Sequence, residues 1–261
     1  MGKIVTYNGK VVKGSSGMIA SVPGVPAGLP AKTMRFDFHY DHFNPIEGLI
    51  DHSAQGFIWT HVHDDVYDFH YDNPIWVMNY GLSQQTGLFN VYAYKGGGGT
   101  VYPFGTHDMD VIDSNLSGVM AVTSLFNSAR GVRNCVLKNT GDIVDAYALF
   151  YHNLIKLETI NSLDLHSVNN IRYMMYGCKY LTSELNITLS GHVTDCSSAF
   201  YGCTKVPGGA LDLYNQLSSQ ETLPSSYSNC FKNCGRGTTT GAAELAQIPT
   251  SWGGTMAEGN E

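Results

Sequence analysis

The sequence predicts an α+β fold in three parts: an N-terminal arm and linker over residues 1–33, a small β-rich domain over 34–110, and a short solenoid of strand–helix repeats with a C-terminal cap over 111–255. Three observations predict it. Hydrophobic residues make up 43% of the chain and charged residues 14%, which is enough apolar surface for a sizeable core. The chain has 29 glycines and 16 tyrosines, a composition that favours strands and turns over long helices. An apolar pattern also recurs in the second half with a period of about 25 residues.

The arm is predicted from a hairpin signal followed by linker composition. IVTYNGKVV (4–12) has β-branched residues on both sides of Asn-Gly, which is typical of a two-residue hairpin turn. VPGVPAGLP (22–30) is too rich in proline and glycine for a helix or a central strand. A hairpin on an extended linker is suited to docking, so we expect residues 1–33 to contact other proteins. The alternative is a disordered tail.

The β-rich domain is predicted from alternating apolar residues. MRFDFHY (34–40) alternates as a half-buried strand does, and VYDFHY (66–71) places its aromatic residues on one face. LFNVYAY (88–94) is a further candidate strand. Four consecutive glycines at 96–99 predict a loop, because glycine loses the most backbone entropy in regular structure.

The repeat is defined by Phe126, Phe150, Met175 and Phe200, which recur at this regular interval. In each copy the residues seven, four and one before this anchor are apolar, which predicts one buried face of a short helix. A polar turn follows, and then a strand-like segment at Val132, Leu157, Leu181 and Val206. This period is that of the leucine-rich-repeat class. The predicted repeat core comprises Val122, Phe126, Phe150, Ile171, Met175, Cys178, Cys196, Phe200, Cys203 and Phe231.

The C-terminal end is predicted to close the stack. Phe231 anchors a degenerate fifth copy, which lies more than one period after Phe200 because a segment with a helical apolar face (210–217) is inserted between them. TTTGAAELAQIP (238–249) predicts a short helix that ends before its proline, and Trp252 is expected to cover the end of the core.

The repeat resembles a known family. MMYGCKYLTSEL (174–185) and AFYGCTKV (199–206), preceded by SVNNIRY (167–173) and HVTDCSS (192–198), closely resemble the BspA-like leucine-rich repeats of gut and oral bacteria and their phages. The likeness covers residues 111–206 well and 207–255 more loosely, and the first copy lacks the Gly-Cys element. Surface proteins of this family are adhesins that bind host matrix. Related repeats are common in virion proteins of Bacteroides-type phages, and TYNGKVV (6–12) resembles a short N-terminal segment of those proteins.

The resemblance implies a non-enzymatic virion structural protein, a fibre or other appendage that is anchored by residues 1–33 and displays its repeats for attachment to a host-surface protein or glycan. The segment MGKIVTYNGK has lysines but no apolar region behind them, so it is unlike a secretory signal. This favours assembly in the host cytoplasm. By analogy with phage appendages we expect a homo-oligomer, namely a trimer. The alternatives are a bacterial surface adhesin and, with less support, a glycan-active enzyme.

Composition excludes several partners. The net charge is −7 and no run of lysine or arginine occurs, so a nucleic-acid partner is not expected. No apolar stretch is long enough for a membrane span, so membrane insertion is not expected. No nucleophile motif or acid–base pair predicts a catalytic residue, and KGGGGT (95–100) lacks the spacing of a phosphate-binding loop, so no cofactor is expected.

Two sets of residues are candidate sites. His61 and His63 share a face if residues 57–63 form a strand, and with Asp64 and Asp65 nearby they are candidate metal ligands; otherwise they are exposed polar residues. Trp59 and Trp76 are candidate surface-contact aromatics or, alternatively, core. The six cysteines form no C-x-x-C pair, and we expect them to be reduced packing residues.

Overall fold

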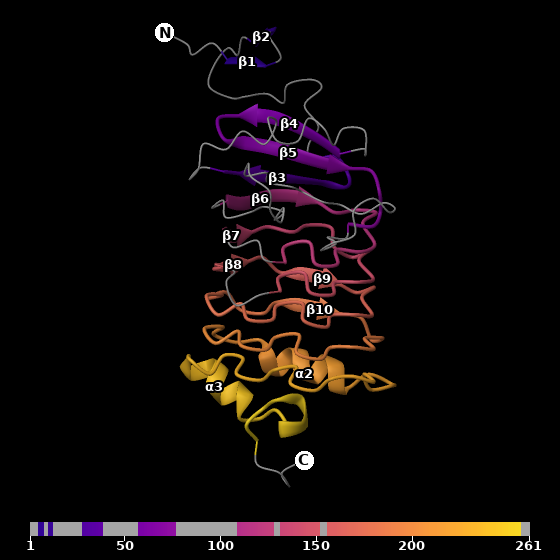
Figure 1. Ribbon diagram of the computed structural model, residues 1–261, viewed down its shortest axis with the longest axis vertical. Helices are drawn as coiled ribbons and strands as arrows, with labels where there is room; N and C mark the ends of the chain where they lie inside the picture. The colour runs from indigo at the N-terminus through magenta and orange to yellow at the C-terminus, as the bar shows by residue number, and fades with distance from the viewer. Residues whose placement is uncertain are drawn as a thin grey trace, which may run out of the picture.

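The computed structural model describes residues 5–7, 10–12, 28–38, 57–76, 109–127, 131–151 and 156–256 (Figure 1). Within these residues the protein is a mixed α/β fold in which strands dominate and two α-helices lie near the C-terminal end. The strands of the folded body cross the long axis of the molecule and are stacked along it (Figure 1). The predicted strand at 88–94 and the glycine loop at 95–100 lie outside the described residues.

The predicted N-terminal hairpin is present. β1 (Val5–Tyr7) pairs antiparallel with β2 (Lys10–Val12), with Tyr7 opposite Lys10, so the two residues between the strands are Asn8 and Gly9. This is the loop length that an Asn-Gly turn favours.

Six strands form the main sheet, in the order β4–β5–β3–β6–β7–β8. The first four pair antiparallel, and β6, β7 and β8 pair parallel. The predicted alternation holds, because Met34, Phe36 and Phe69 are fully buried while the residues between them are half-exposed. The bounds are β3 Thr33–Asp37, β4 Phe57–His63, β5 Val66–Tyr71, β6 Met109–Asn115, β7 Val132–Cys135 and β8 Thr159–Ile160.

The expected boundary between residues 110 and 111 falls inside β6, so the sheet runs across it. The described residues on both sides of this position belong to one hydrophobic core that extends from Met34 to Trp252. The physical reason is that the first repeat has an open end, and the antiparallel strands supply the backbone partners and apolar side chains that cover it.

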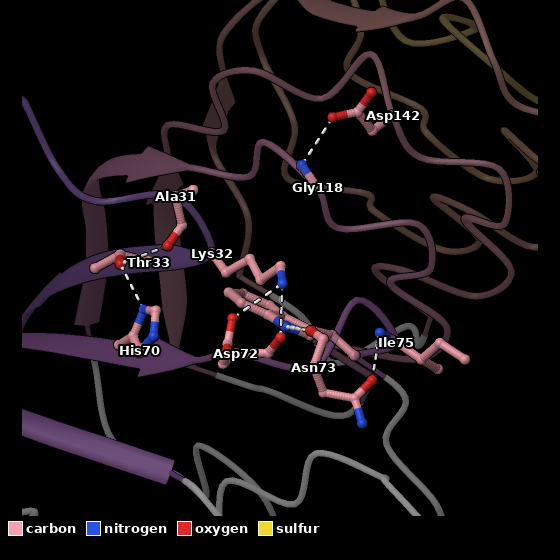
Figure 2. Close-up of polar contacts among 10 residues, drawn as sticks. Ala31, Lys32, Thr33, His70, Asp72, Asn73, Ile75, Gly118 and Asp142 are labelled. Carbon is pink, nitrogen blue, oxygen red and sulfur yellow. Dashed lines mark hydrogen bonds and ion pairs between the residues drawn. The ribbon is translucent and has the colours of Figure 1, made fainter.

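The join between the strands and the repeats is polar on its outside (Figure 2). Lys32 Nζ donates to the main-chain oxygen of Asp72 at 2.6 Å and to its carboxylate at 3.0 Å. Asn115 Nδ2 donates to the oxygen of Leu29 at 2.7 Å. Residues 29–33 therefore belong to the folded body, although the sequence placed them in the linker.

Each repeat is a run of tight turns. An N–H within the turn donates three residues back, and the next N–H donates to the following copy: Met174 N bonds to Ile171 O at 3.0 Å, and Met175 N to Ala199 O at 2.8 Å. Parallel bridges connect the copies at matching positions, Ile75, Ala121, Asp145, Asn170, Asp195 and Ser226. We call this series of turns the repeat stack (residues 116–127, 140–151, 165–178, 190–203 and 223–234).

The prediction of a short helix in each repeat is therefore wrong. The residue two before each anchor has a left-handed backbone, with φ between 53° and 56°: Ser124, Ala148, Tyr173, Ser198 and Asn229. An α-helix cannot contain such a residue and keeps its N–H bonds within the element. The apolar spacing of three residues misled the prediction, since successive three-residue turns bury the same offsets as a helix.

The segments after the anchors are only partly strands. β7 begins at Val132 as predicted, and β8 begins two residues after Leu157. No strand begins at Leu181 or Val206. A separate parallel pair, β9 (Leu163–Leu165) and β10 (Ile187–Leu189), lies where two copies enter the repeat stack.

The two helices that the sequence predicts near the C-terminal end are present. α2 (Ala210–Ser218) buries Ala210, Leu213 and Leu217. α3 (Thr239–Leu245) begins after Thr238, whose hydroxyl accepts a bond from Gly241 N at 3.1 Å, as a helix N-cap does. Trp252, in the 3₁₀ turn Thr250–Trp252, is 5% exposed and stacks on Tyr227 with ring centroids 4.3 Å apart.

Candidate functional site

The repeated Tyr-Gly-Cys sequence forms a corner of the repeat stack, and its cysteine points inward. Gly177 and Gly202 have φ of 77° and 75°, and Asn233 takes the same left-handed form in the fifth copy with φ of 62°. Cys178 Sγ donates to Phe150 O at 3.3 Å, and Cys203 Sγ donates to Met175 O at 3.1 Å. The two thiols thus make the same contact one turn apart.

These buried thiols are poor nucleophiles. The hydrogen bond with Cys203, together with burial, raises the pKa of Cys178 well above its usual value. Burial raises the pKa of Cys135, Cys230 and Cys234 in the same way. Because the thiolate is the reactive form of cysteine, the thiols on the interior side of the corner are unreactive at neutral pH and serve as packing groups.

The outer side of the corner carries a column of tyrosines. Tyr151, Tyr176 and Tyr201 each follow an anchor by one residue and are half-exposed. Their rings stack at centroid distances of 5.2 and 4.8 Å, with interplanar angles of 29° and 13°. Lys232 occupies the same offset in the next copy, with Nζ 5.9 Å from the centre of the Tyr201 ring. Because the stacked faces cover one another, the column offers ring edges and hydroxyl groups to solvent.

Two more tyrosines extend this column sideways. Tyr173 lies edge-on to Tyr151 and Tyr176 at 5.4 and 5.6 Å, and Tyr147 lies edge-on to Tyr173 at 6.1 Å. The Arg172 guanidinium lies 4.8 Å from the centre of the Tyr173 ring and donates to the Tyr173 hydroxyl at 3.2 Å. Burial, followed by the neighbouring phenols, raises the pKa of Tyr176. The Tyr176 phenol therefore stays protonated, as a hydrogen-bond donor, at neutral pH.

Positively charged residues are concentrated on the segments that carry these tyrosines. Residues 172–180, 197–205 and 228–236 contain five cations and no aspartate or glutamate, although the whole chain has 15 basic and 22 acidic residues. Lys179 and Lys205 lie 5.2 and 5.4 Å from the centre of the Tyr180 ring, and this tyrosine is 39% exposed. We call these segments, with residues 147–151, the tyrosine–cation corner. Its cations are Arg172, Lys179, Lys205, Lys232 and Arg236.

The structure places the predicted metal candidates at the exposed turn between β4 and β5. His61 Nε2 is 2.9 Å from Asp64 O, and His63 Nδ1 is 3.3 Å from an Asp64 carboxylate oxygen. A register shift separates the two histidines on the strand. Within the described parts of the chain, no three histidine, cysteine, aspartate or glutamate side chains gather closely enough to hold a metal ion.

Trp76 is not a surface-contact residue. It is fully buried, its ring lies edge-on to Phe69 at 5.8 Å, and its Nε1 donates to Asn73 O at 2.8 Å. Pairing of the adjacent Ile75 with Ala121 draws this indole under the first turn of the repeat stack. Trp59 lies in β4 opposite Phe69, and its side chain is outside what the structure describes.

All ten predicted core residues lie in the interior with no exposed surface: Val122, Phe126, Phe150, Ile171, Met175, Cys178, Cys196, Phe200, Cys203 and Phe231. Two pairs of anchors stack ring on ring, Phe126 with Phe150 at 5.2 Å and Phe200 with Phe231 at 5.6 Å.

Sequence reasoning missed the tyrosine column, although its signal is present. Tyrosine follows the anchor in three successive copies, at 151, 176 and 201. A polar aromatic repeated at one fixed offset beside a buried anchor indicates a surface row, because equivalent positions of successive copies lie next to one another on the same side of a stack of repeats. The candidate site is therefore a row of phenols flanked by cations, which can donate hydrogen bonds and attract negative charge.

Comparisons with known proteins add no relative: no protein-family model, curated protein or solved structure matches the chain. The helices that the structure describes are too short and too polar to cross a bilayer.

Proposed function

We propose that this protein is a non-catalytic recognition protein in which the repeat stack is a short leucine-rich-repeat solenoid of the BspA-like kind. It serves as a fibre or appendage component of a phage virion, anchored by its N-terminal arm. The tyrosine–cation corner attaches it to a polymer on the host surface. The observation that carries this proposal is the tyrosine column, which presents the same group in three successive turns of the repeat stack.

A periodic surface suits a periodic ligand. Tyrosines that recur every 4.8 to 5.2 Å make the same weak contact at each step along a chain-like polymer. Many weak contacts then sum to useful affinity. Tyrosine suits such surfaces because it combines contact area with a hydroxyl and has few rotatable bonds to immobilise. The fully buried core holds the row rigid, so little conformational entropy is lost on binding.

Binding to intact cells tests the recognition role. The labelled protein and its Tyr176→Ser/Tyr201→Ser variant are added to host bacteria, with Ile112→Ser as a matched control, because Ile112 is an exposed residue of β6 outside the corner. The tyrosine variant should bind at least about tenfold more weakly, since two contacts near the centre of an interface are lost. The control should bind like the parent. Equal binding by all three proteins would contradict the proposal.

Incorporation into particles tests the virion role. Residues 1–27 precede the six-stranded sheet and the repeat stack, so their deletion should leave a folded protein that is absent from purified phage particles by mass spectrometry. Unchanged incorporation would disprove anchoring by the arm. Finding the full-length protein on bacterial cells and not in particles would identify it as a surface adhesin instead.

A further inference from the structure

We propose that the tyrosine–cation corner binds a linear anionic polysaccharide, one whose sugar residues carry carboxylate or sulfate groups. This rests on the proposed function, in which the corner is the recognition surface, and it adds the chemical class of the ligand. Three features of the corner lead to it: its uncompensated positive charge, its covered ring faces and its spacing.

The positive charge of the corner is largely uncompensated. Among the described residues, no carboxylate lies within ion-pair distance of Lys179, Lys205 or Lys232. Arg172 has one acidic neighbour, Asp195, at 3.9 Å. In a chain with a net charge of −7, a region in which cations meet aromatic rings and not acids attracts an anionic ligand by charge complementarity.

The covered ring faces disfavour neutral sugars. Uncharged glycans bind proteins largely by placing a sugar ring on an open aromatic face. In the tyrosine column the faces of Tyr176 are taken by Tyr151 and Tyr201, and Lys232 lies over the ring of Tyr201. Phenol hydroxyls and ammonium groups remain, and these are donors that suit carboxylate, sulfate and hydroxyl oxygens.

The spacing favours a sugar chain over other polyanions. The interval of 4.8 to 5.2 Å between rings is close to the length that one pyranose residue adds to an extended chain. An extended peptide advances about 3.3 Å per residue, so its side chains would lose register with the column. Nucleic acid carries about one charge per 1.7 Å of duplex axis and requires a denser cationic surface than one or two cations per turn.

Direct binding to a defined polymer tests this inference. The probe is polygalacturonate, which has one carboxylate per sugar, and its matched control is the methyl-esterified polymer, which has the same backbone without the charge. By isothermal titration at low salt, the full-length protein should bind polygalacturonate at least about tenfold more tightly than the ester. Binding should weaken strongly in about 0.5 M salt, where screening shortens the range of the attraction.

Variants locate the binding site. Lys205→Gln/Lys232→Gln should bind about tenfold more weakly, and Tyr176→Phe/Tyr201→Phe, which keeps the stacked rings, should bind several-fold more weakly. Lys138→Gln is the matched control, because Lys138 is an exposed cation paired with Asp113 outside the corner and should not change binding. Circular dichroism verifies that every variant is folded.

The outcomes separate this inference from the proposed function. If host cells are bound through the tyrosines but only the neutral ester binds in solution, the anionic class is wrong and the recognition role stands. Equal loss of binding in Lys138→Gln would disprove the assignment to the corner. Equal or tighter binding of single-stranded DNA would identify a general polyanion surface and overturn the polysaccharide. If neither polymer binds while the tyrosine-dependent binding to cells persists, the inference also fails.

Discussion

Gly202 lies at the corner of the repeat stack with a φ of 75°, a left-handed conformation that is strained for a residue with a side chain. Space does not limit this position, because an added Cβ would lie 3.7 Å from the nearest atom, the Cα of Gly177. The Gly202→Ala variant should therefore lose about 1–2 kcal/mol of the free energy of unfolding through backbone strain alone. Urea denaturation measures the loss.

Gly191→Ala is the control for this prediction. A Cβ at Gly191 would meet nothing within 4 Å, and its φ is not left-handed. This variant should match the parent to within about 0.5 kcal/mol or be slightly more stable, because alanine lowers the entropy of the unfolded chain. An equal loss in both variants would show that the conformation at the corner is not what requires glycine.

The buried thiols predict how stability depends on alkaline pH. Burial holds the pKa of Cys135, Cys230 and Cys234 above the value of about 8.5 in an unfolded chain, and the hydrogen bond with Cys203, together with burial, does the same for Cys178. The unfolded state then loses these protons first, so the stabilisation is complete below about pH 8.5 and declines as pH rises toward the folded pKa. The slope approaches about 1.4 kcal/mol per pH unit for each thiol.

Urea denaturation from pH 7 to 9.5 tests this dependence on pH. The free energy of unfolding should be nearly flat to about pH 8 and should then fall. Cys135→Ala should be less stable at pH 7 but should show a shallower decline, because one titrating thiol is gone. A free energy that is constant to pH 9.5 would contradict the assignment of buried, protonated thiols.

Single residues were predictable from the sequence where they occupy equivalent positions in successive copies of the repeat. Periodicity placed all ten core candidates, including Cys178 and Cys203, at positions that the structure buries. Trp76 was ambiguous, since an indole in a short apolar segment, here between Ile75 and Val77, has the same local sequence in a core as on a contact surface. What buries it is its pairing with Ala121, which is distant along the chain, and no local pattern reports such a contact.

At the scale of elements, the cap helices were predictable and the turns were not. The sequence of α2 has the 3.6-residue apolar pattern of a helix, and the structure buries the residues of that pattern, Ala210, Leu213 and Leu217. In the repeats the same spacing of three or four residues arises from consecutive turns, whose alternate N–H groups bond to the next copy. Periodicity reports which offsets are buried, and it does not report where the backbone hydrogen bonds go.

Glu244 makes an element-scale contact that no local signal reveals. α2 begins after its N-cap residue Gly209, which has no side chain to cap the helix. The Glu244 carboxylate of α3 instead accepts from Gly209 N and Leu211 N, each at 3.2 Å. Glu244→Ala should lower the free energy of unfolding by about 1–2 kcal/mol, as loss of a charged N-terminal cap does. Urea denaturation measures the change.

Two further variants separate capping from charge. Glu244→Gln keeps one acceptor oxygen and should lose about half as much as Glu244→Ala. Glu221→Ala removes an exposed carboxylate near the other end of α2, and its stability should stay within about 0.5 kcal/mol of the parent. If Glu221→Ala costs as much as Glu244→Ala, general electrostatics and not the cap would explain the effect.

At the scale of the molecule, the sequence predicted the buried repeat positions and the C-terminal helices but divided the chain near residue 110, where the sheet is continuous. The division followed a change in composition near residue 110. The sheet crosses it because β6 pairs antiparallel with β3 on one side and parallel with β7 on the other. Whether a strand pairs parallel or antiparallel does not change its alternation of buried and exposed residues. Periodicity therefore could not reveal that the sheet continues through β6.

This continuity predicts that the two ends of the folded body unfold together. Phe69→Ala opens a cavity beside Trp76 at the N-terminal end and should cost about 3 kcal/mol or more. In a cooperatively unfolding body the loss of free energy of unfolding applies equally to the C-terminal turns. The amide of Phe231, which donates to Trp252 O at 3.0 Å, should therefore exchange its hydrogen about a hundredfold faster.

Hydrogen exchange with mass spectrometry measures this, and Ile112→Ser should change the exchange rate at neither end. Faster exchange confined to β3 and β5 would mean two independent units divided near residue 110, and the shared core would then not couple the strands to the repeats.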